Sequence, residues 1–192
     1  MKKEKQRLIR RNFEGHLWII SGEIGAGKTV LCASLIKAFE DLGWLISGLR
    51  SPAIMEAGKK IGIAVENLST KEIRQLAVHD YKPDGLEDEP IHWTFDPQVL
   101  AWGNQVFAHA VPTDLLVVDE VGPLEMKREQ GWVNALPALD SRQYRQAILV
   151  MRPKLLAMSQ SRWPWASTIE IETVEQVPAI TNELMQEWIS GK

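Results

Sequence analysis

Two glycines separated by four residues, followed by a lysine and a threonine, constrain the fold of this chain of 192 residues more than any other feature. The eight residues 22–29 read Gly-Glu-Ile-Gly-Ala-Gly-Lys-Thr. Glycine permits the tight backbone that turns successive N–H groups toward one anion, lysine neutralises negative charge, and the hydroxyl residue offers an oxygen to a cation. This is the Walker A pattern. We therefore name residues 22–29 the phosphate loop and expect them to bind a nucleoside triphosphate.

The residues on either side of the phosphate loop fit a strand and a helix. An apolar run at residues 16–20 precedes the loop, and Gly43 ends a segment with apolar residues at helical spacing, namely Leu31, Leu35, Phe39 and Leu42. Strand, loop and amphipathic helix are the setting that this motif requires. A Rossmann dinucleotide site is excluded, because no third glycine follows Gly25 and Gly27 at the required spacing.

The motif assigns roles to individual residues. We expect Lys28 to bind the outer phosphates and assist catalysis, and Thr29 to ligate Mg²⁺. Contacts with the nucleotide are expected from nine consecutive residues: Gly22, Glu23, Ile24, Gly25, Ala26, Gly27, Lys28, Thr29 and Val30.

A second motif, at residues 115–120, reads Leu-Leu-Val-Val-Asp-Glu and has the form of a Walker B strand. Four apolar residues place two acids at the carboxyl end of a buried strand, where open α/β sheets bind ligands. We expect Asp119 to hold Mg²⁺, directly or through water, and Glu120 to orient or deprotonate the attacking water. Acids often end strands simply because they face solvent, but the phosphate loop favours the functional interpretation.

Strand and helix patterns alternate along the rest of the chain. Further strands are expected at residues 44–49, 61–65, 147–151 and 168–171, with 61–65 in a hairpin with the preceding segment. Further helices are expected from Ser69 to about Val78 with Glu72 completing a capping box, from Asp96-Pro97, at 130–138 with Pro137 as a possible end, and at 182–189. This alternation indicates an α/β fold with a parallel sheet covered on both faces.

Length and charge suggest one domain with a basic extension. We place the domain at residues 13–192 and a basic N-terminal arm at residues 1–12. Residues 1–11 carry six Lys or Arg and one Glu, although the formal net charge of the chain is −3. A basic arm can contact nucleic acid or another polyanion, but a solvated tail is the stronger interpretation. No nucleic-acid partner is expected elsewhere, because the remainder is acidic.

The chain has the features of a cytoplasmic protein. It contains one cysteine, Cys32, which we expect to be a small core residue in a reducing compartment. The apolar runs are too short to span a membrane, and the charged N-terminus has no signal-peptide core. The acidic, proline-broken segment 82–90 is expected to be a solvated connection, with a mobile cover over the nucleotide as the alternative.

Three segments together resemble a known family. Residues 22–29, residues 58–63 (Gly-Lys-Lys-Ile-Gly-Ile) and residues 119–125 (Asp-Glu-Val-Gly-Pro-Leu-Glu) look like the small nucleoside-triphosphatase family that includes the cancer-related nucleoside triphosphatase. The resemblance implies a three-layer, RecA-like P-loop fold with a mainly parallel central sheet that hydrolyses nucleoside triphosphates, ATP or GTP among them, to diphosphate and phosphate with Mg²⁺. The family has an arginine and an aromatic residue where this chain has Lys60 and Ile63. Lysine keeps the charge but loses the planar fork of arginine.

The site also needs a cation for the charge that develops during transfer. Arg152 follows the expected strand at 147–151, and a strand inserted between the two motif strands would bring it beside the γ-phosphate. We expect Arg152 to act as a sensor or internal arginine finger; the competing candidates are Arg50, Lys60 and Arg162. A structural ion pair is the alternative to any such role.

Three classes of function remain open. Mg²⁺-dependent nucleoside-triphosphate hydrolysis leads, because Glu120 beside Asp119 supplies a candidate base. A nucleotide or small-molecule kinase would use the same loop, but no arginine cluster typical of a lid is present. The third class is a nucleotide-dependent switch that binds a protein partner, whose identity the sequence does not give. Trp163 and Trp165 either pack in the core or stack on a base.

Overall fold

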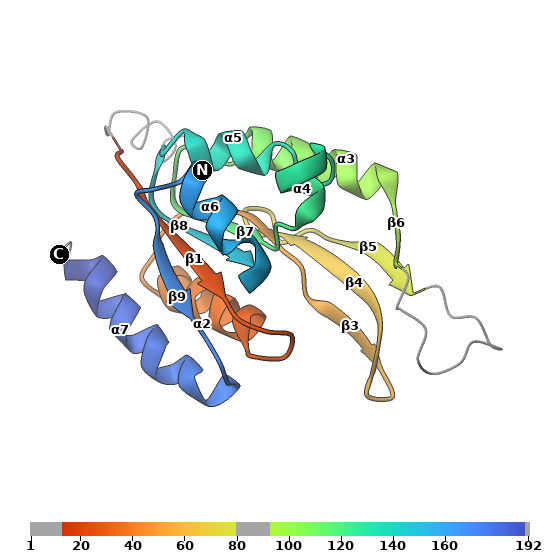
Figure 1. Ribbon diagram of the computed structural model, residues 1–192, viewed down its shortest axis with the longest axis horizontal. Coiled ribbons are helices and arrows are strands. Elements are labelled where there is room, and N and C mark those ends of the chain that lie inside the picture. Colours follow the sequence, from red (N-terminus) through yellow and green to blue (C-terminus); the bar gives the residue numbers. More distant parts are fainter. Residues whose placement is uncertain (1–12, 80–92, 191–192) are drawn as a thin grey trace.

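One mixed sheet of nine strands organises the chain (Figure 1), whose computed structural model describes residues 13–79 and 93–190. The strand order is β6-β5-β4-β2-β7-β8-β1-β9, and β3 pairs with β4 off this path. The bounds are β1 His16–Ser21, β2 Ile46–Arg50, β3 Ala53–Glu56, β4 Lys59–Asn67, β5 Ile73–His79, β6 Trp93–Phe95, β7 Thr113–Asp119, β8 Tyr144–Met151 and β9 Ser167–Glu170. Strands β2, β7, β8, β1 and β9 pair in parallel, whereas β3 to β6 form an antiparallel wing joined to β2.

Helices cover both faces of this sheet. Figure 1 shows α3, α4, α5 and α6 on one face and α2 and α7 on the other. The bounds are α2 Lys28–Asp41, α3 Pro97–Ala108, α4 Pro123–Arg128, α5 Ala135–Asp140, α6 Leu156–Arg162 and α7 Val177–Ser190, with short 3₁₀ turns η1 Pro153–Leu155 and η2 Val174–Gln176. The three-layer α/β arrangement with a mainly parallel sheet is the predicted one.

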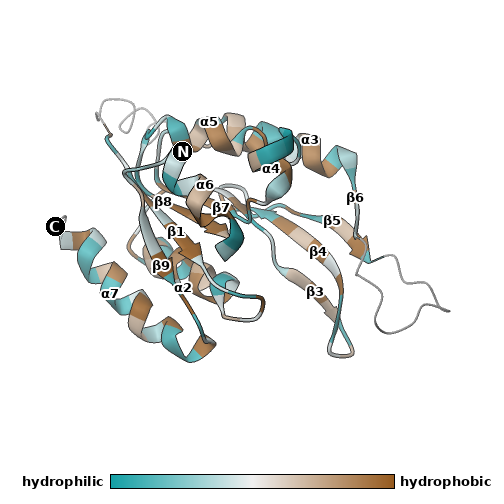
Figure 2. Cartoon of the chain, in the orientation of Figure 1, coloured by the Kyte–Doolittle hydropathy of each residue, from teal (hydrophilic) through white to brown (hydrophobic). Residues whose placement is uncertain are grey.

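Strand β7 divides the interior into two cores. All seven of its residues are buried, as expected for a parallel strand with helices on both sides. Leu116 and Val118 enter the core beneath α3 and α5. Leu115 and Val117 enter the core beneath α2 and α7. Figure 2 shows β7 and the strands beside it as the apolar centre of the chain. The acids that follow Val118 therefore emerge from the most buried part of the sheet.

The helix predicted from Ser69 to Val78 is wrong, because this segment forms a turn and strand β5. The Asn67 side chain accepts a hydrogen bond from the backbone N–H of Ser69 over 3.0 Å, and Lys71 adopts a φ of 62° in a tight turn. Such local bonds compete with helix initiation. The residues after the turn pair with β4 on one side and β6 on the other, so tertiary pairing overrides the local capping signal.

The helix predicted at residues 130–138 is also displaced. The structure has two short helices, α4 and α5, and the segment between them buries Trp132. Pro137 lies within α5 as its third residue and does not end it. Proline is tolerated in the first turn because the N–H groups there have no partner within the helix.

The remaining predicted elements are present, with shifted ends. The helix from Asp96-Pro97 is α3, with the Asp96 side chain accepting from Gln98 and Val99, and the predicted hairpin is β3 and β4. The predicted basic arm, residues 1–12, and the acidic segment 82–90 lie outside the described residues. Within the described ranges, no helix combines the length and apolar character needed to cross a membrane.

Candidate active site

The phosphate loop connects the end of β1 to the start of α2, at the carboxyl edge of the parallel strands. A Cβ atom at Gly22 would lie 2.2 Å from the carbonyl oxygen of Ile171, so glycine alone lets the loop pass the segment after β9. Gly27 precedes α2 with a φ of 104°, a left-handed conformation that favours glycine. The sequence motif and the tight backbone that it predicts therefore occur together.

Lys28 lies inside the loop that precedes it. Its Nζ donates to the carbonyl oxygens of Gly22, over 2.7 Å, and of Glu23, over 2.9 Å. The side chain is nearly buried, whereas Thr29 and Val30 on the first turn of α2 are exposed. The N-terminus of α2 adds a positive dipole end and free N–H groups to the lysine charge. This part of the site is built to receive an anion.

Asp119 ends β7 and is 3% exposed. The pKa of this carboxyl group is raised to about 6, chiefly by burial and to a smaller extent by the negative charge of the neighbouring Glu120. The hydrogen bond from the Ser51 backbone N–H to Oδ2, over 3.2 Å, and the charges of Arg50 and Lys28 act in the opposite direction. Asp119 is thus a desolvated acid close to the phosphate-loop lysine.

Glu120 and Arg152 meet at the same edge of the sheet. Strand β8 lies between β1 and β7, and Arg152 follows it directly. Arg152 Nε donates to Glu120 Oε1 over 3.0 Å, and both side chains are accessible to solvent. The predicted insertion of a strand between the two motif strands is present. It brings together the candidate cation and the candidate base.

The three competing basic residues lie in different surroundings. Lys60 stacks over the Trp93 ring at 5.0 Å in the antiparallel wing, and Arg162 pairs with Asp140. Arg50 ends β2, beside Asp119, and pairs with Glu66. Of the three, Arg50 is therefore the one that lies beside the Walker B acid.

Trp163 and Glu125 each have a structural role. Trp163 is fully buried and donates from Nε1 to Asp140 Oδ1 over 2.7 Å, so it packs in the core and does not stack on a base. Glu125 accepts from the backbone N–H groups of Gly122, over 2.8 Å, and Trp132, over 3.0 Å. Glu125 therefore holds the chain after the Walker B acids in place, a role that its position in the motif does not reveal.

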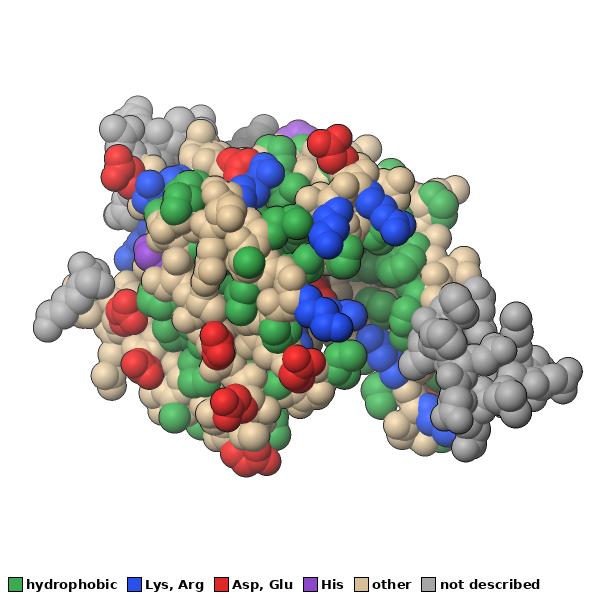
Figure 3. All heavy atoms as spheres, viewed as in Figure 1, with side chains coloured by type: hydrophobic (Ala, Val, Ile, Leu, Met, Phe, Trp, Pro, Cys, Tyr) green, Lys and Arg blue, Asp and Glu red, His purple; other side chains and the backbone are tan. Residues whose placement is uncertain are grey.

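A cavity beside the phosphate loop and a separate basic hollow lie near the site. A cavity of about 240 Å³ lies between the phosphate loop, η1 and the segment after β9, lined by Ser21, Gly22, Glu23, Pro153, Leu156, Glu170, Ile171 and Glu172. Figure 3 shows Lys and Arg side chains gathered around the hollow between the main body and the antiparallel wing, with acidic side chains over α7 and β9. Positive potential at a hollow attracts anions.

The oxygen donors present fit a small divalent cation. Asp119 supplies a carboxylate and Thr29 a hydroxyl, which are ligand types that Mg²⁺ prefers. Among the described residues, Asp119 has no ion pair within 4.0 Å. The Ser51 hydroxyl beside it is buried and has no hydrogen-bond partner in the described part of the chain. A buried acid without a paired base is stabilised by a cation.

A model of the family described as NTPase matches residues 17–152, more than half of the chain and both motifs. The chain belongs to this NTPase family. The sequence resemblance to small nucleoside triphosphatases is thereby confirmed.

Relatives of this chain carry names that agree with the family. The nucleoside-triphosphatase THEP1 of Caldivirga maquilingensis is 27% identical over 165 residues, which are 86% of this chain and 91% of that protein. The THEP1 of Methanopyrus kandleri is 27% identical over 114 residues, or 58% of this chain, and the match spans 61% of that relative. The solution structure of a human cancer-related nucleoside triphosphatase superposes with a TM-score of 0.60 at 16% identity, covering 90% of this chain and 98% of that one. This likeness supports the P-loop fold.

Sequence reasoning missed two residues of this candidate site. Ser51 contacts Asp119 through its backbone, and Glu66 binds the Arg50 guanidinium. Ser51 directly follows β2, a position at the carboxyl edge of the sheet that would have identified it once β7 was placed next to that strand. Glu66 has no local signal, because its partner is determined by the antiparallel pairing of β4 with β2.

Proposed function

We propose that this chain is a Mg²⁺-dependent nucleoside triphosphatase that binds ATP or GTP through residues 22–30 and releases nucleoside diphosphate and phosphate. The observation that carries the proposal is the convergence of Lys28, Asp119, Glu120 and Arg152 at one edge of the sheet, around the phosphate loop. The family match and the names of the relatives support it. We further propose that residues 13–192 act as one domain.

Each residue has a role that follows from its position. The backbone N–H groups of the loop and Lys28 bind the triphosphate, and the first turn of α2 adds its dipole. Thr29 and Asp119 would hold Mg²⁺, which supplies charge neutralisation at the β- and γ-phosphates when bound. These groups position the substrate and withdraw negative charge from the phosphate that is transferred.

Glu120 is the proposed general base. Its carboxylate accepts a proton of the attacking water, and the new P–O bond to the γ-phosphorus forms as the bond to the leaving nucleoside diphosphate breaks. Arg152 balances the charge on the transferred phosphoryl group. Arg152 binds Oε1 of Glu120 in this structure, and we expect the phosphates of the substrate to draw the guanidinium away and make the carboxylate a stronger base.

A phosphate-release assay tests the proposal. Purified chain is incubated with ATP, GTP, CTP or UTP, with Mg²⁺ or with a chelator, and free phosphate is measured in parallel with a Lys28→Ala variant. Release that needs both Mg²⁺ and Lys28 is the expected result. The absence of release with every nucleotide overturns the hydrolase proposal, and transfer of the phosphate to an added acceptor favours the kinase alternative.

A further inference from the structure

Arg50 and Asp119 end neighbouring strands side by side. Strands β2 and β7 pair in parallel with Leu49 opposite Val118, so the residues that follow, Arg50 and Asp119, are neighbours on one face. That face is covered by α2, because Val117, two residues before Asp119, lies in the core beneath this helix. The hydrogen bond from the Ser51 N–H to Asp119 ties the two strand ends together.

Arg50 nevertheless binds a carboxylate on its other side. Its Nε and Nη2 donate to Glu66 Oε2 over 3.2 and 2.6 Å, and Glu66 is the register partner of Arg50 on β4. Within the described ranges, Asp119 has no ion pair within 4.0 Å. Arg50 therefore lies on the strand between those that carry two largely buried carboxylates, and its guanidinium is bound by one of them.

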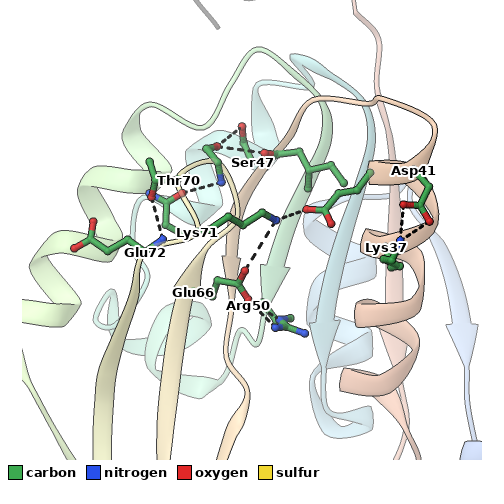
Figure 4. A network of polar contacts seen from close by, with 12 residues as sticks. Lys37, Asp41, Ser47, Arg50, Glu66, Thr70, Lys71 and Glu72 are labelled. Carbon is green, nitrogen blue, oxygen red and sulfur yellow. Dashed lines mark hydrogen bonds and ion pairs between the residues drawn. The ribbon is translucent and has the colours of Figure 1, made fainter.

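Glu66 is held by a second cation. Its Oε1 lies 4.0 Å from Lys71 Nζ, and Lys71 also pairs with Glu40 near the end of α2. Figure 4 shows Glu66 between Arg50 and Lys71. The Glu66 side chain is 11% exposed, so Arg50 binds one of its oxygens with little competition from water, and the charge of Lys71 lies near the other.

We propose that Glu66 is a positioning residue that holds Arg50 away from Asp119 and thereby keeps Asp119 available to a divalent cation. The inference rests on the proposed function for the identity of that cation as Mg²⁺. Neighbouring strands lie about 4.8 Å apart, a gap that an arginine side chain spans easily. When Glu66 on β4 loses its charge, Arg50 still has the Asp119 carboxylate on β7, the strand on its other side. An ion pair between Arg50 and Asp119 must then break before the cation binds.

Mg²⁺-dependent binding of ADP tests this role without requiring turnover. ADP affinity is measured by calorimetry at a series of Mg²⁺ concentrations for wild type, Glu66→Gln, Arg50→Met and the double variant. Glu66→Gln is expected to raise the Mg²⁺ concentration for half-maximal ADP binding about tenfold, equivalent to about 1.4 kcal/mol. The double variant is expected to return to the wild-type requirement, because the competing guanidinium has gone. Arg50→Met alone is expected to keep or lower that requirement.

The matched control is Glu72→Gln, which breaks an exposed ion pair with Arg74 in the same antiparallel wing. It should leave the Mg²⁺ requirement unchanged. Thermal melts confirm that each variant folds; if Glu66→Gln does not, Glu66→Asp, with its shorter reach, is expected to give a smaller rise. A Glu66→Gln variant with the wild-type requirement overturns the proposal, as does a double variant that stays impaired. Weaker ADP binding of Arg50→Met at saturating Mg²⁺ also overturns it, because Arg50 then contacts the nucleotide.

The two proposals fail in different ways. Wild-type chain that binds ADP with Mg²⁺ but releases no phosphate from triphosphates refutes hydrolysis and leaves the role of Glu66 standing if the double variant rescues. Phosphate release by wild type together with an unchanged Glu66→Gln titration refutes the role of Glu66 alone. ADP binding that does not depend on Mg²⁺ in wild type overturns the role of Glu66 directly.

Discussion

Arg152 donates a hydrogen bond from Nε to Oε1 of Glu120 over 3.0 Å, which joins the candidate transition-state cation to the candidate base. The pair forms because β8, which delivers Arg152, lies next to β7, which delivers Glu120. Both side chains are partly exposed, at 59% and 35%, so the pair contributes little to stability and can separate easily. A substrate with three phosphates competes for the same guanidinium.

Replacing Arg152 by alanine should reduce the chemical step more than nucleotide binding. An arginine that stabilises transition-state charge contributes about 10³-fold or more to turnover. Single-turnover phosphate release and equilibrium binding of ADP with Mg²⁺ separate the two effects. Equal losses in binding and turnover would show that Arg152 acts in the ground state as well and is not specific to the transition state.

Glu120→Gln should retain nucleotide binding and lose turnover by about 10² to 10⁴, because glutamine keeps the size of the side chain but cannot accept the proton. Glu129→Gln, an exposed acid that follows α4, is the matched control and should hydrolyse normally. Phosphate release at saturating nucleotide is the measurement. Hydrolysis by Glu120→Gln at the wild-type rate would remove Glu120 as the base.

The features that the sequence predicted well are those with local causes. The phosphate loop is fixed by glycine, lysine and threonine at short spacing, and β7 is a continuous apolar run that can be buried on both faces. The position of Arg152 follows from the order of strands that this class of fold implies. These signals lie within single segments or follow from the topology.

The features that it missed depend on contacts between distant segments. Strand β5 was predicted as a helix because Ser69 and Glu72 have capping-box spacing, whereas pairing with β4 and β6 decides its conformation. Glu66 faces Arg50 across an antiparallel pair, and no short-range pattern records that pairing. Trp132 is buried from a non-helical segment between α4 and α5, where the sequence predicted part of a single helix at residues 130–138.

Lys28→Ala and Thr29→Ala should weaken the site in different ways. Loss of the lysine removes a charge-assisted phosphate contact and should lower triphosphate affinity about tenfold to a hundredfold. Loss of the threonine hydroxyl should act through Mg²⁺ and diminish when Mg²⁺ is raised. Calorimetric titration with ATP and a chelator, then with ATP and Mg²⁺, distinguishes them. Unchanged binding and turnover in both variants would contradict the phosphate-loop assignment.

Because Asp119 is buried, we expect its ionised carboxylate to lower the free energy of unfolding of the chain. Burial raises the pKa of Asp119 from its ordinary 3.8 to about 6, so the folded chain binds this proton more tightly than the unfolded chain does. Stability from this group is therefore present at low pH and is lost as pH rises from about 4 to about 6. A shift of this size corresponds to about 2 to 3 kcal/mol at pH 7.

Asp119→Asn should therefore raise the free energy of unfolding at pH 7 in the absence of Mg²⁺, by up to about 2 to 3 kcal/mol, and change it little near pH 4. Asparagine keeps an oxygen that can accept the Ser51 hydrogen bond but cannot ionise. Urea unfolding at the two pH values measures the difference. Asp41→Asn, an exposed acid on α2 that pairs with Lys37, should show no such gain. An Asp119→Asn variant that is less stable than wild type at pH 7 would mean that this carboxylate is stabilised in the folded chain and that its buried charge is already compensated.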